Sequence, residues 1–154
     1  MFGTVFGIPA HPLFVHAAVV FVPLLALFAV LYALMPGWRV KIGWATAILA
    51  VITPLITLIT KLSGDKFITY RFPQGAPSNV LAHRHFGTML LWFTLGLGVA
   101  TLLLLFVHRW SRQEMRPAWL RAGSQLLAIV LAVVAVYYVV RTGDSGAVAV
   151  WGRS

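Results

Sequence analysis

Four long stretches of the chain are apolar and contain no charged side chain. They run over residues 12–35, 42–60, 86–107 and 122–140 and are between 19 and 24 residues long. A helix rises ~1.5 Å per residue and the hydrocarbon layer of a bilayer is ~30 Å thick, so each stretch can cross once. The first stretch is not a cleavable signal peptide, because it is too long and no basic segment precedes it. The pattern predicts four transmembrane helices.

The connections between these stretches are short except for residues 61–85. This segment contains Pro73 and Pro77 and is predicted to be an ordered loop. Short connections place successive helices side by side and antiparallel. We therefore predict an all-α integral membrane protein, an up-down-up-down four-helix transmembrane bundle forming a single domain over residues 1–154. No internal repeat stands out.

The composition agrees with a membrane protein. Hydrophobic residues make up 60% of the chain and charged residues 10%, against about 25% charged residues in soluble domains, and the mean hydropathy is +0.91. The absence of cysteine excludes disulfides, thiolate metal sites, iron–sulfur clusters and covalently attached haem c. The net charge of +9 comes from basic residues at the ends of apolar stretches, so we expect the bilayer, and not nucleic acid, as the partner.

An even number of spans places both termini on one side of the membrane, and the basic residues divide equally between the two sides. Six lie on the side of the termini: Lys61, Lys66, Arg71, Arg84, Arg141 and Arg153. Six lie on the other side: Arg39, Lys41, Arg109, Arg112, Arg116 and Arg121. The second group is concentrated in two short loops with one acid, Glu114, and is bordered by Trp38, Trp44, Trp110 and Trp119. We expect that side to face the cytoplasm of a bacterium, and both termini to lie outside its cytoplasmic (inner) membrane.

Four of the five histidines are expected at the end of the bundle that carries the termini. His11 and His16 open the first span, and His83 and His85 open the third. Ionisable side chains at membrane depth are costly and usually mark function, and neutral imidazole ligates zinc, copper and haem iron. The fifth, His108, stands at the opposite end and is expected to be a solvated histidine at a helix end.

The predicted cofactor is haem b, with copper or another transition metal, or no cofactor, as alternatives. His16 lies more than a turn inside an apolar stretch, and His85 is its expected partner across the bundle, so these two are the predicted axial ligands. Arg84 and Arg141 are placed to meet the haem propionates. Met89, one turn beyond His85, is an additional candidate for a metal ligand.

The remaining candidates are expected to support this site. His11 and His16 are five residues apart and so diverge by about 140° on a helix, which makes His11, with His83, an outer or alternate ligand. Asp65 and Asp144 follow the second and fourth spans at the same end and are predicted to orient imidazole N–H groups.

Each candidate also has a purely structural interpretation. His11 could be a helix-start residue before Pro12, His83 a loop-end residue, and His16 with His85 a hydrogen-bonded pair. Met89 could be core filler. The two acids could pair with Lys66, Arg84 or Arg141. Gly143-Asp144-Ser145-Gly146 looks like the nucleophile segment of trypsin-like proteases, but that chemistry needs a soluble scaffold with its own base and oxyanion hole, so we reject this interpretation.

Three segments resemble a known family. Phe6-Gly-Ile-Pro-Ala-His-Pro-Leu-Phe-Val-His16, Leu62-Ser-Gly-Asp65 and His85 are similar to the bacterial domain of unknown function 2231, and the HPxxxH opening is the most specific part. The resemblance covers nearly the whole chain and implies a small four-span membrane protein, of a kind sometimes fused to Rieske-type domains. The tail departs from the family, which usually has a Gly-Gly pair followed by an apolar-Val-Tyr segment where this chain has residues 145–152.

We therefore expect a small membrane subunit that binds haem or a metal and serves electron transfer within a larger redox complex, without catalytic activity of its own. The main alternative is a non-redox structural subunit in which the histidines and acids form a hydrogen-bonded network. A proton or metal-ion permease is a third interpretation. It is disfavoured because no acid lies within a span and no inverted repeat is visible.

Overall fold

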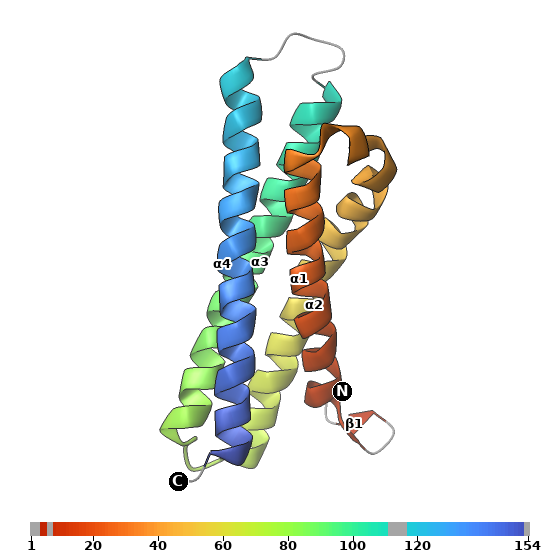
Figure 1. The fold of residues 1–154 in the computed structure, drawn as a ribbon. Coiled ribbons are helices and arrows are strands. Elements are labelled where there is room, and N and C mark those ends of the chain that lie inside the picture. The colour runs from red at the N-terminus through yellow and green to blue at the C-terminus, as the bar shows by residue number, and fades with distance from the viewer. Residues whose placement is uncertain (1–3, 6–7, 111–116, 153–154) are drawn as a thin grey trace.

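The computed structural model describes residues 4–5, 8–110 and 117–152 and consists mainly of four long helices (Figure 1). The helices are α1 (Ala10–Leu34), α2 (Arg39–Arg71), α3 (Ser78–Trp110) and α4 (Ala118–Trp151). Two-residue strands β1 (Thr4–Val5) and β2 (Ile8–Pro9) pair antiparallel before α1, and the 3₁₀ turn η1 (Pro36–Trp38) joins α1 to α2. Arg112, Glu114, Arg116 and Arg153, which entered the expected charge balance, lie outside the described residues.

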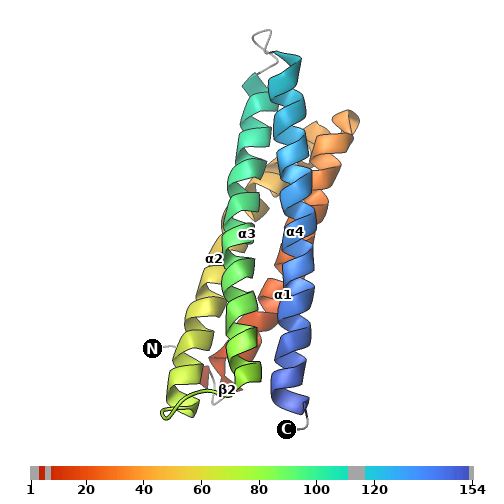
Figure 2. The ribbon, with the colours of Figure 1, turned by 90° about the vertical axis from the view of Figure 1, so that its left-hand side faces the viewer.

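The helices form an up-down-up-down bundle, as predicted. Successive helices run antiparallel, and α4 packs against both α3 and α1, while α1 and α3 lie diagonally across the bundle. Figure 2 shows α3 and α4 side by side along their length, and Figure 1 shows both termini at the same end, called here the terminal end. This end holds the start of α1 and α3 and the end of α2 and α4.

The side chains are arranged as in a bundle surrounded by lipid. Small residues form the buried line of α4, which consists of Ser124, Ala128, Ala132, Ala135 and Val139. Large apolar side chains face outwards instead: Trp92, Leu126 and Val133 are each 64% exposed. All four helices are long and apolar enough to cross a membrane, so the chain is a multi-pass membrane protein in contact with lipid.

The segment 61–85, predicted as an ordered loop, is mostly helical. α2 continues to Arg71 and α3 begins at Ser78, so residues 72–77 alone form the connection. Charges at Lys61 and Asp65 end the apolar stretch but not the helix, because at spacing i, i+4 they form an ion pair on its surface. The break is confined to the prolines and to Gly75, whose φ of +118° favours glycine.

The helices consequently extend beyond the hydrocarbon layer. α2 and α3 each have 33 residues, and at ~1.5 Å per residue they are ~50 Å long, against ~30 Å of hydrocarbon. Apart from Arg39 and Lys41 in its first turn, the charged residues of α2 lie in its last third, so most of the excess length falls at the terminal end. The histidines near that end therefore lie close to the boundary between lipid and water.

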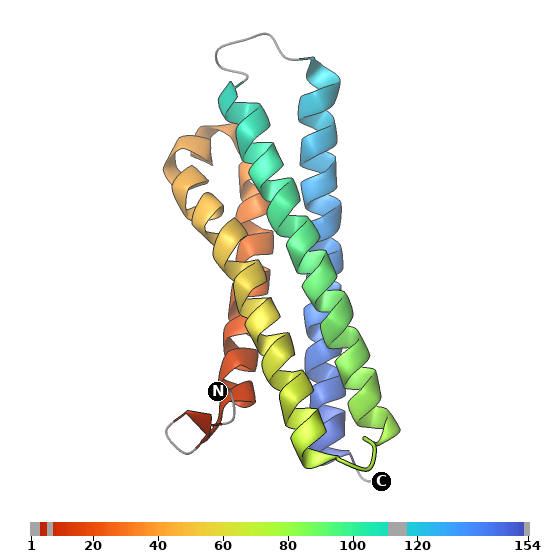
Figure 3. The ribbon, with the colours of Figure 1, turned by 180° about the vertical axis from the view of Figure 1, so that it is seen from behind.

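Pro54 shapes the middle of α2. Proline has no N–H, so the carbonyl of Ala50 loses its donor within the helix. Gly98 of α3 packs against this site, where a Cβ would lie 2.6 Å from the Ala50 oxygen and 2.9 Å from Cγ of Pro54. The half of α2 that begins at Arg39 leans away from the bundle (Figure 3), as expected for a helix with an internal proline.

Candidate functional site

A pocket of about 830 Å³ occupies the terminal end of the bundle, and all four helices line it. Its wall is largely apolar, with residues such as Val15, Ile68, Leu90 and Val139. Two imidazoles, those of His11 and His83, stand inside this wall, each partly buried. Apolar pockets with a few convergent polar groups are the usual form of a small-molecule or cofactor site.

His11 projects from the first turn of α1 and is held by α2. Its Nδ1 lies 3.1 Å from Oγ of Ser63, and this hydroxyl donates its single proton to the carbonyl of Thr60 at 2.7 Å. The hydroxyl can then only accept from the imidazole, so Nδ1 of His11 carries the proton. Nε2 has no hydrogen-bond partner among the described residues and keeps its lone pair.

His83 projects from the second turn of α3 and is held by α4 in the same way. Its Nδ1 lies 3.0 Å from the carbonyl of Thr142 and 3.2 Å from Oγ of Ser145, which itself donates to Thr142 at 3.0 Å. A carbonyl can only accept, so Nδ1 of His83 is also protonated. Its Nε2 likewise has no partner within the described part of the chain.

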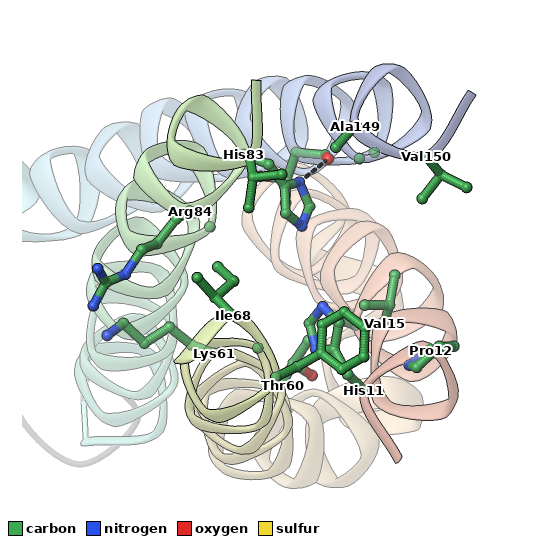
Figure 4. Close-up of a pocket in the computed structure, with 18 of the residues that line it drawn as sticks. His11, Pro12, Val15, Thr60, Lys61, Ile68, His83, Arg84, Ala149 and Val150 are labelled. Carbon is green, nitrogen blue, oxygen red and sulfur yellow. Dashed lines mark hydrogen bonds between the residues drawn. The ribbon is translucent and has the colours of Figure 1, made fainter. Parts of the chain in front are cut away.

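The two imidazoles lie opposite one another across the pocket. Their ring centres are 6.4 Å apart and their planes differ by 75°. In Figure 4 the nitrogen of His83 that is not in the dashed hydrogen bond points into the open centre of the pocket, and His11 stands on the facing side. Phe67 of α2 stacks against the His11 ring at 6.2 Å between centres and helps to fix its orientation. Two lone pairs thus face a common space.

The structure does not bring together His16 and His85, the expected axial pair. His16 is exposed at the margin of the pocket, and its Nδ1 donates to the carbonyl of Pro12 in its own helix at 2.6 Å. His85 is exposed, does not line the pocket and packs edge-on against Phe86. The inward-facing pair is His11 and His83, because these residues lie on the faces of α1 and α3 that pack against α2 and α4.

The two acids pair with basic residues, as their structural interpretation has it, and show no hydrogen bond to a histidine. Asp65 accepts from Lys61 and, at 2.9 Å, from Nε of Arg84. Asp144 lies 3.8 Å from a guanidinium nitrogen of Arg141. The partners that orient the imidazoles are instead the hydroxyls and carbonyls described above.

The other predicted ligands lie differently. Met89 is partly buried and does not line the pocket, and Arg141 lies over the ring of Phe86, 4.9 Å from its centre, and not at the pocket wall. Arg84 does line the pocket, together with Lys61 and Arg71, which were not among the predicted site residues. In Figure 4 the charged ends of Arg84 and Lys61 extend away from the centre, towards the rim.

His108, expected to be solvated, is buried. It is 8% exposed; its Nδ1 donates to the carbonyl of Leu104 at 2.9 Å, and its Nε2 accepts from Nε2 of Gln125 at 3.4 Å. Tyr32 of α1 packs edge-on against its ring at 6.0 Å between centres. The prediction was wrong because α4 begins early enough to cover this end of α3.

Ser63, Thr142 and Ser145 were missed as functional residues. Their signal in the sequence was a pair of Ser-Gly dipeptides near the ends of the second and fourth helices, which the protease-like Gly-Asp-Ser-Gly pattern obscured. Within the described residues, no three side chains of the types His, Cys, Asp and Glu come together as they would in a conventional zinc site. The protein thus offers a two-nitrogen site in an apolar pocket.

Comparison with known proteins assigns the chain to a family. No curated protein and no solved structure matches it significantly. Residues 7–154 match the family described as Predicted membrane protein (DUF2231), in agreement with the HPxxxH opening and the four apolar helices. The chain therefore belongs to the DUF2231 family of membrane proteins.

Proposed function

We propose that this protein binds a transition-metal cofactor, haem b in the first instance, between His11 and His83, and passes single electrons as an accessory subunit of a larger membrane complex. One observation carries the proposal. Two imidazoles from different helices face each other across an apolar pocket, with ring centres 6.4 Å apart and a free Nε2 on each.

The separation of the rings suits a metal between them. A bond of ~2.0 Å from the metal to each nitrogen, and ~1.2 Å from each nitrogen to its ring centre, give ~6.4 Å between the centres. The observed separation is 6.4 Å without any adjustment of the side chains. The two rings come from diagonally opposed helices, which is how an axial pair would approach a porphyrin from its two faces.

The donor set favours haem over a bare ion. Two imidazoles leave half of the usual coordination positions of zinc, and more than half of those of iron, unfilled, whereas a porphyrin supplies four further nitrogens itself. The pocket of about 830 Å³ lies within the range of ~300–1,000 Å³ that is usual for ligands of this size. Copper in its +1 state is the alternative, since two imidazole nitrogens suit it without further ligands.

The rim of the pocket suits acidic groups such as propionates. Lys61, Arg71 and Arg84 line it, and the cluster of Lys61, Asp65 and Arg84 keeps one net positive charge. Arg84 uses Nε for Asp65, which leaves the terminal nitrogens of its guanidinium available. Arg141, the other predicted propionate partner, would have to leave Phe86 to contribute.

The chemistry that follows is electron transfer. A haem with two histidine ligands has no open position for a substrate and exchanges single electrons instead. His11 and His83 would hold the iron, while the apolar wall would exclude water from it. A chain of 16.9 kDa without a soluble domain in its described part would need other membrane redox subunits as donor and acceptor.

The orientation we propose places this pocket on the outer face of the bacterial cytoplasmic membrane. The opposite end carries Arg39, Lys41, Arg109 and Arg121, with Trp38, Trp44 and Trp119 beside them. Short basic loops face the cytoplasm preferentially, and tryptophan concentrates at the membrane interface. Both termini would then be extracytoplasmic.

A structural subunit is the second candidate, and one observation favours it. The hydrogen bonds of His11 and His83 fasten α1 to α2 and α3 to α4 and would do so without any cofactor. Such a structural subunit would be colourless, and loss of His11 or His83 would affect its stability alone.

The test is a reduced-minus-oxidised visible spectrum with metal analysis of the gently purified protein and its histidine variants. We expect a split α band, which His11→Ala or His83→Ala abolishes. His16→Ala and His85→Ala are the matched controls, because they remove exposed histidines from the same ends of the same two helices and should keep the spectrum. If the wild type instead contains stoichiometric copper, and His11→Ala and His83→Ala lose it, the cofactor is copper and not haem. A colourless, metal-free wild type that also fails to bind added haemin or Cu(I) would overturn the proposal in favour of the structural subunit.

A further inference from the structure

We infer that the site is built from two copies of one half-site, in which Ser63 with Gly64 and Ser145 with Gly146 are positioning residues that aim imidazole lone pairs at an electron-pair acceptor. The identity of the ligand rests on the proposed function. The geometry of the half-sites does not, and it can be tested on the protein without a ligand.

The half-sites share a sequence pattern and a position in the fold. The pattern Thr-x-x-Ser-Gly occurs as Thr60-Lys-Leu-Ser-Gly64 near the end of α2 and as Thr142-Gly-Asp-Ser-Gly146 near the end of α4. Each copy receives an imidazole from the start of the preceding helix, His11 from α1 and His83 from α3. The hairpins α1–α2 and α3–α4 are therefore equivalent in their contribution to the pocket.

Ser63 fixes the tautomer of His11, and Ser145 together with the carbonyl of Thr142 fixes that of His83. Ser63 donates to Thr60 at 2.7 Å and Ser145 donates to Thr142 at 3.0 Å, so in both copies the only hydroxyl proton is already used. What remains for the imidazole is an oxygen lone pair, which requires a proton on Nδ1. Nε2 must then be unprotonated in the neutral ring, and it faces the pocket in both half-sites.

Each glycine allows the imidazole ring of its histidine to approach the helix closely. A Cβ on residue 64 would lie 2.8 Å from Cε1 of His11, and a Cβ on residue 146 would lie 3.0 Å from Cε1 of His83. Since Cε1 lies between the two ring nitrogens, a methyl group there would displace the whole donor edge of the ring. Gly123 of α4, which does not line the pocket, has nothing within 4 Å of the position of its Cβ.

This arrangement defines the class of ligand. Two imidazoles whose N–H groups are both engaged elsewhere present only lone pairs, so their ligand must accept an electron pair, as a metal centre does or as the proton of a hydrogen-bond donor does. They cannot donate hydrogen bonds to a carbonyl such as that of a quinone, nor attract an anion. The partners that hold the distal nitrogen of a metal-bound histidine commonly change metal affinity by about 10–100-fold when they are removed.

The first experiment uses ¹⁵N-histidine spectra of the full chain in detergent without added ligand. The nitrogen shifts should show His11 and His83, assigned through His11→Gln and His83→Gln, as neutral rings protonated at Nδ1. Ser63→Ala should admit the other tautomer of His11, and Ser63→Thr should restore the original one. Ser145→Ala should leave His83 protonated at Nδ1, because the carbonyl of Thr142 still accepts from it. Rings protonated at Nε2 in the wild type would overturn the inference, whatever the protein binds.

The second experiment titrates haemin and, separately, Cu(I) into glycine variants. Gly64→Ala and Gly146→Ala should each weaken binding at least tenfold, while Gly123→Ala, the control from the same helix as Gly146, should bind as the wild type does. Equal binding by all three variants would overturn the positioning role. If even the wild type binds neither haemin nor Cu(I), the proposed function is wrong. The geometry of the half-sites is then decided by the ¹⁵N-histidine spectra alone, which need no ligand.

Discussion

At the end of the bundle opposite the termini, His108 has both ring nitrogens occupied, whereas at the terminal end His11 and His83 each keep one nitrogen free. The far end is closed by further hydrogen bonds. Arg39 donates to the carbonyls of Tyr32 and Ala33 at 2.9 Å each, and Gln125 donates to Ala33 at 3.0 Å. These bonds satisfy the last carbonyls of α1, which a helix otherwise leaves unpaired.

The difference between the ends shows what makes a buried histidine a ligand candidate. Burial and proximity to other polar groups are common to both ends, and His108 is the most buried of the three histidines. The terminal end differs in two respects: its hydrogen bonds leave a lone pair over, and that lone pair faces a pocket. The far end uses its histidine to join helices, and the terminal end presents its histidines to a ligand.

The largest effects should come from removing one histidine at each end of the bundle and comparing the two variants. His83→Ala should weaken haemin binding by more than 100-fold and change the thermal unfolding midpoint little, since Thr142 and Ser145 lose a partly buried partner but keep the hydrogen bond between them. His108→Ala should bind haemin normally but lose about 1–2 kcal/mol of stability, because it empties a buried position and leaves Gln125 with its hydrogen bond to Ala33 alone. A folded His108→Ala protein that does not bind haemin would erase the distinction between the ends.

A second variant at the far end tests whether a free imidazole nitrogen is sufficient for metal binding. Gln125→Ala removes the donor to Nε2 of His108 and the hydrogen bond to Ala33. We expect a loss of about 1 kcal/mol of stability and no second binding site, since neither an opposing imidazole nor a pocket is present there. Copper stoichiometry measured against the wild type would reveal a second equivalent if a lone pair alone were enough.

The fold was predictable because lipid imposes a simple rule on the sequence. A helix that crosses the bilayer must be apolar over ~20 residues, and four such stretches in 154 residues leave few alternatives to a bundle. The helix ends at the terminal side were not predictable from the same rule. At Lys61 and Asp65 the surroundings change from lipid to water, and hydropathy registers that change although the helix continues to Arg71.

The site was predictable as a region but not as a set of contacts. The sequence placed four histidines at one end and showed that His11 and His16 could not both face inwards. Which of them does so depends on the rotation of α1 about its axis, and packing against α2 and α4 sets that rotation. Depth in the apolar stretch favoured His16, whereas the structure turns it outwards and seats His11 against Ser63.

Substitutions at the rim of the pocket should have a smaller effect on haemin affinity. Arg84→Gln should weaken haemin binding about two- to fivefold, because Arg84 lines the pocket and its guanidinium is within reach of an acidic group at the rim. Arg141→Gln should leave affinity unchanged, since that side chain lies over Phe86. The Arg84 effect should shrink as salt is raised. Titrations at two ionic strengths test this, and equal losses in both variants would contradict the assignment of the rim.

The smallest effects should come from the two acids, which were first expected to orient imidazoles. Asp65→Asn should cost about 1 kcal/mol or less, because its partners Lys61 and Arg84 are both partly exposed, and Asp144→Asn about 0.5 kcal/mol or less at its 65% exposed position. Haemin affinity should stay within twofold of the wild type in both, since neither carboxylate is hydrogen-bonded to a histidine. Thermal unfolding and titration on the same samples separate the two quantities. A large loss of affinity in Asp65→Asn at unchanged stability would mean that the carboxylate, and not the serine and carbonyl pair, controls the imidazoles.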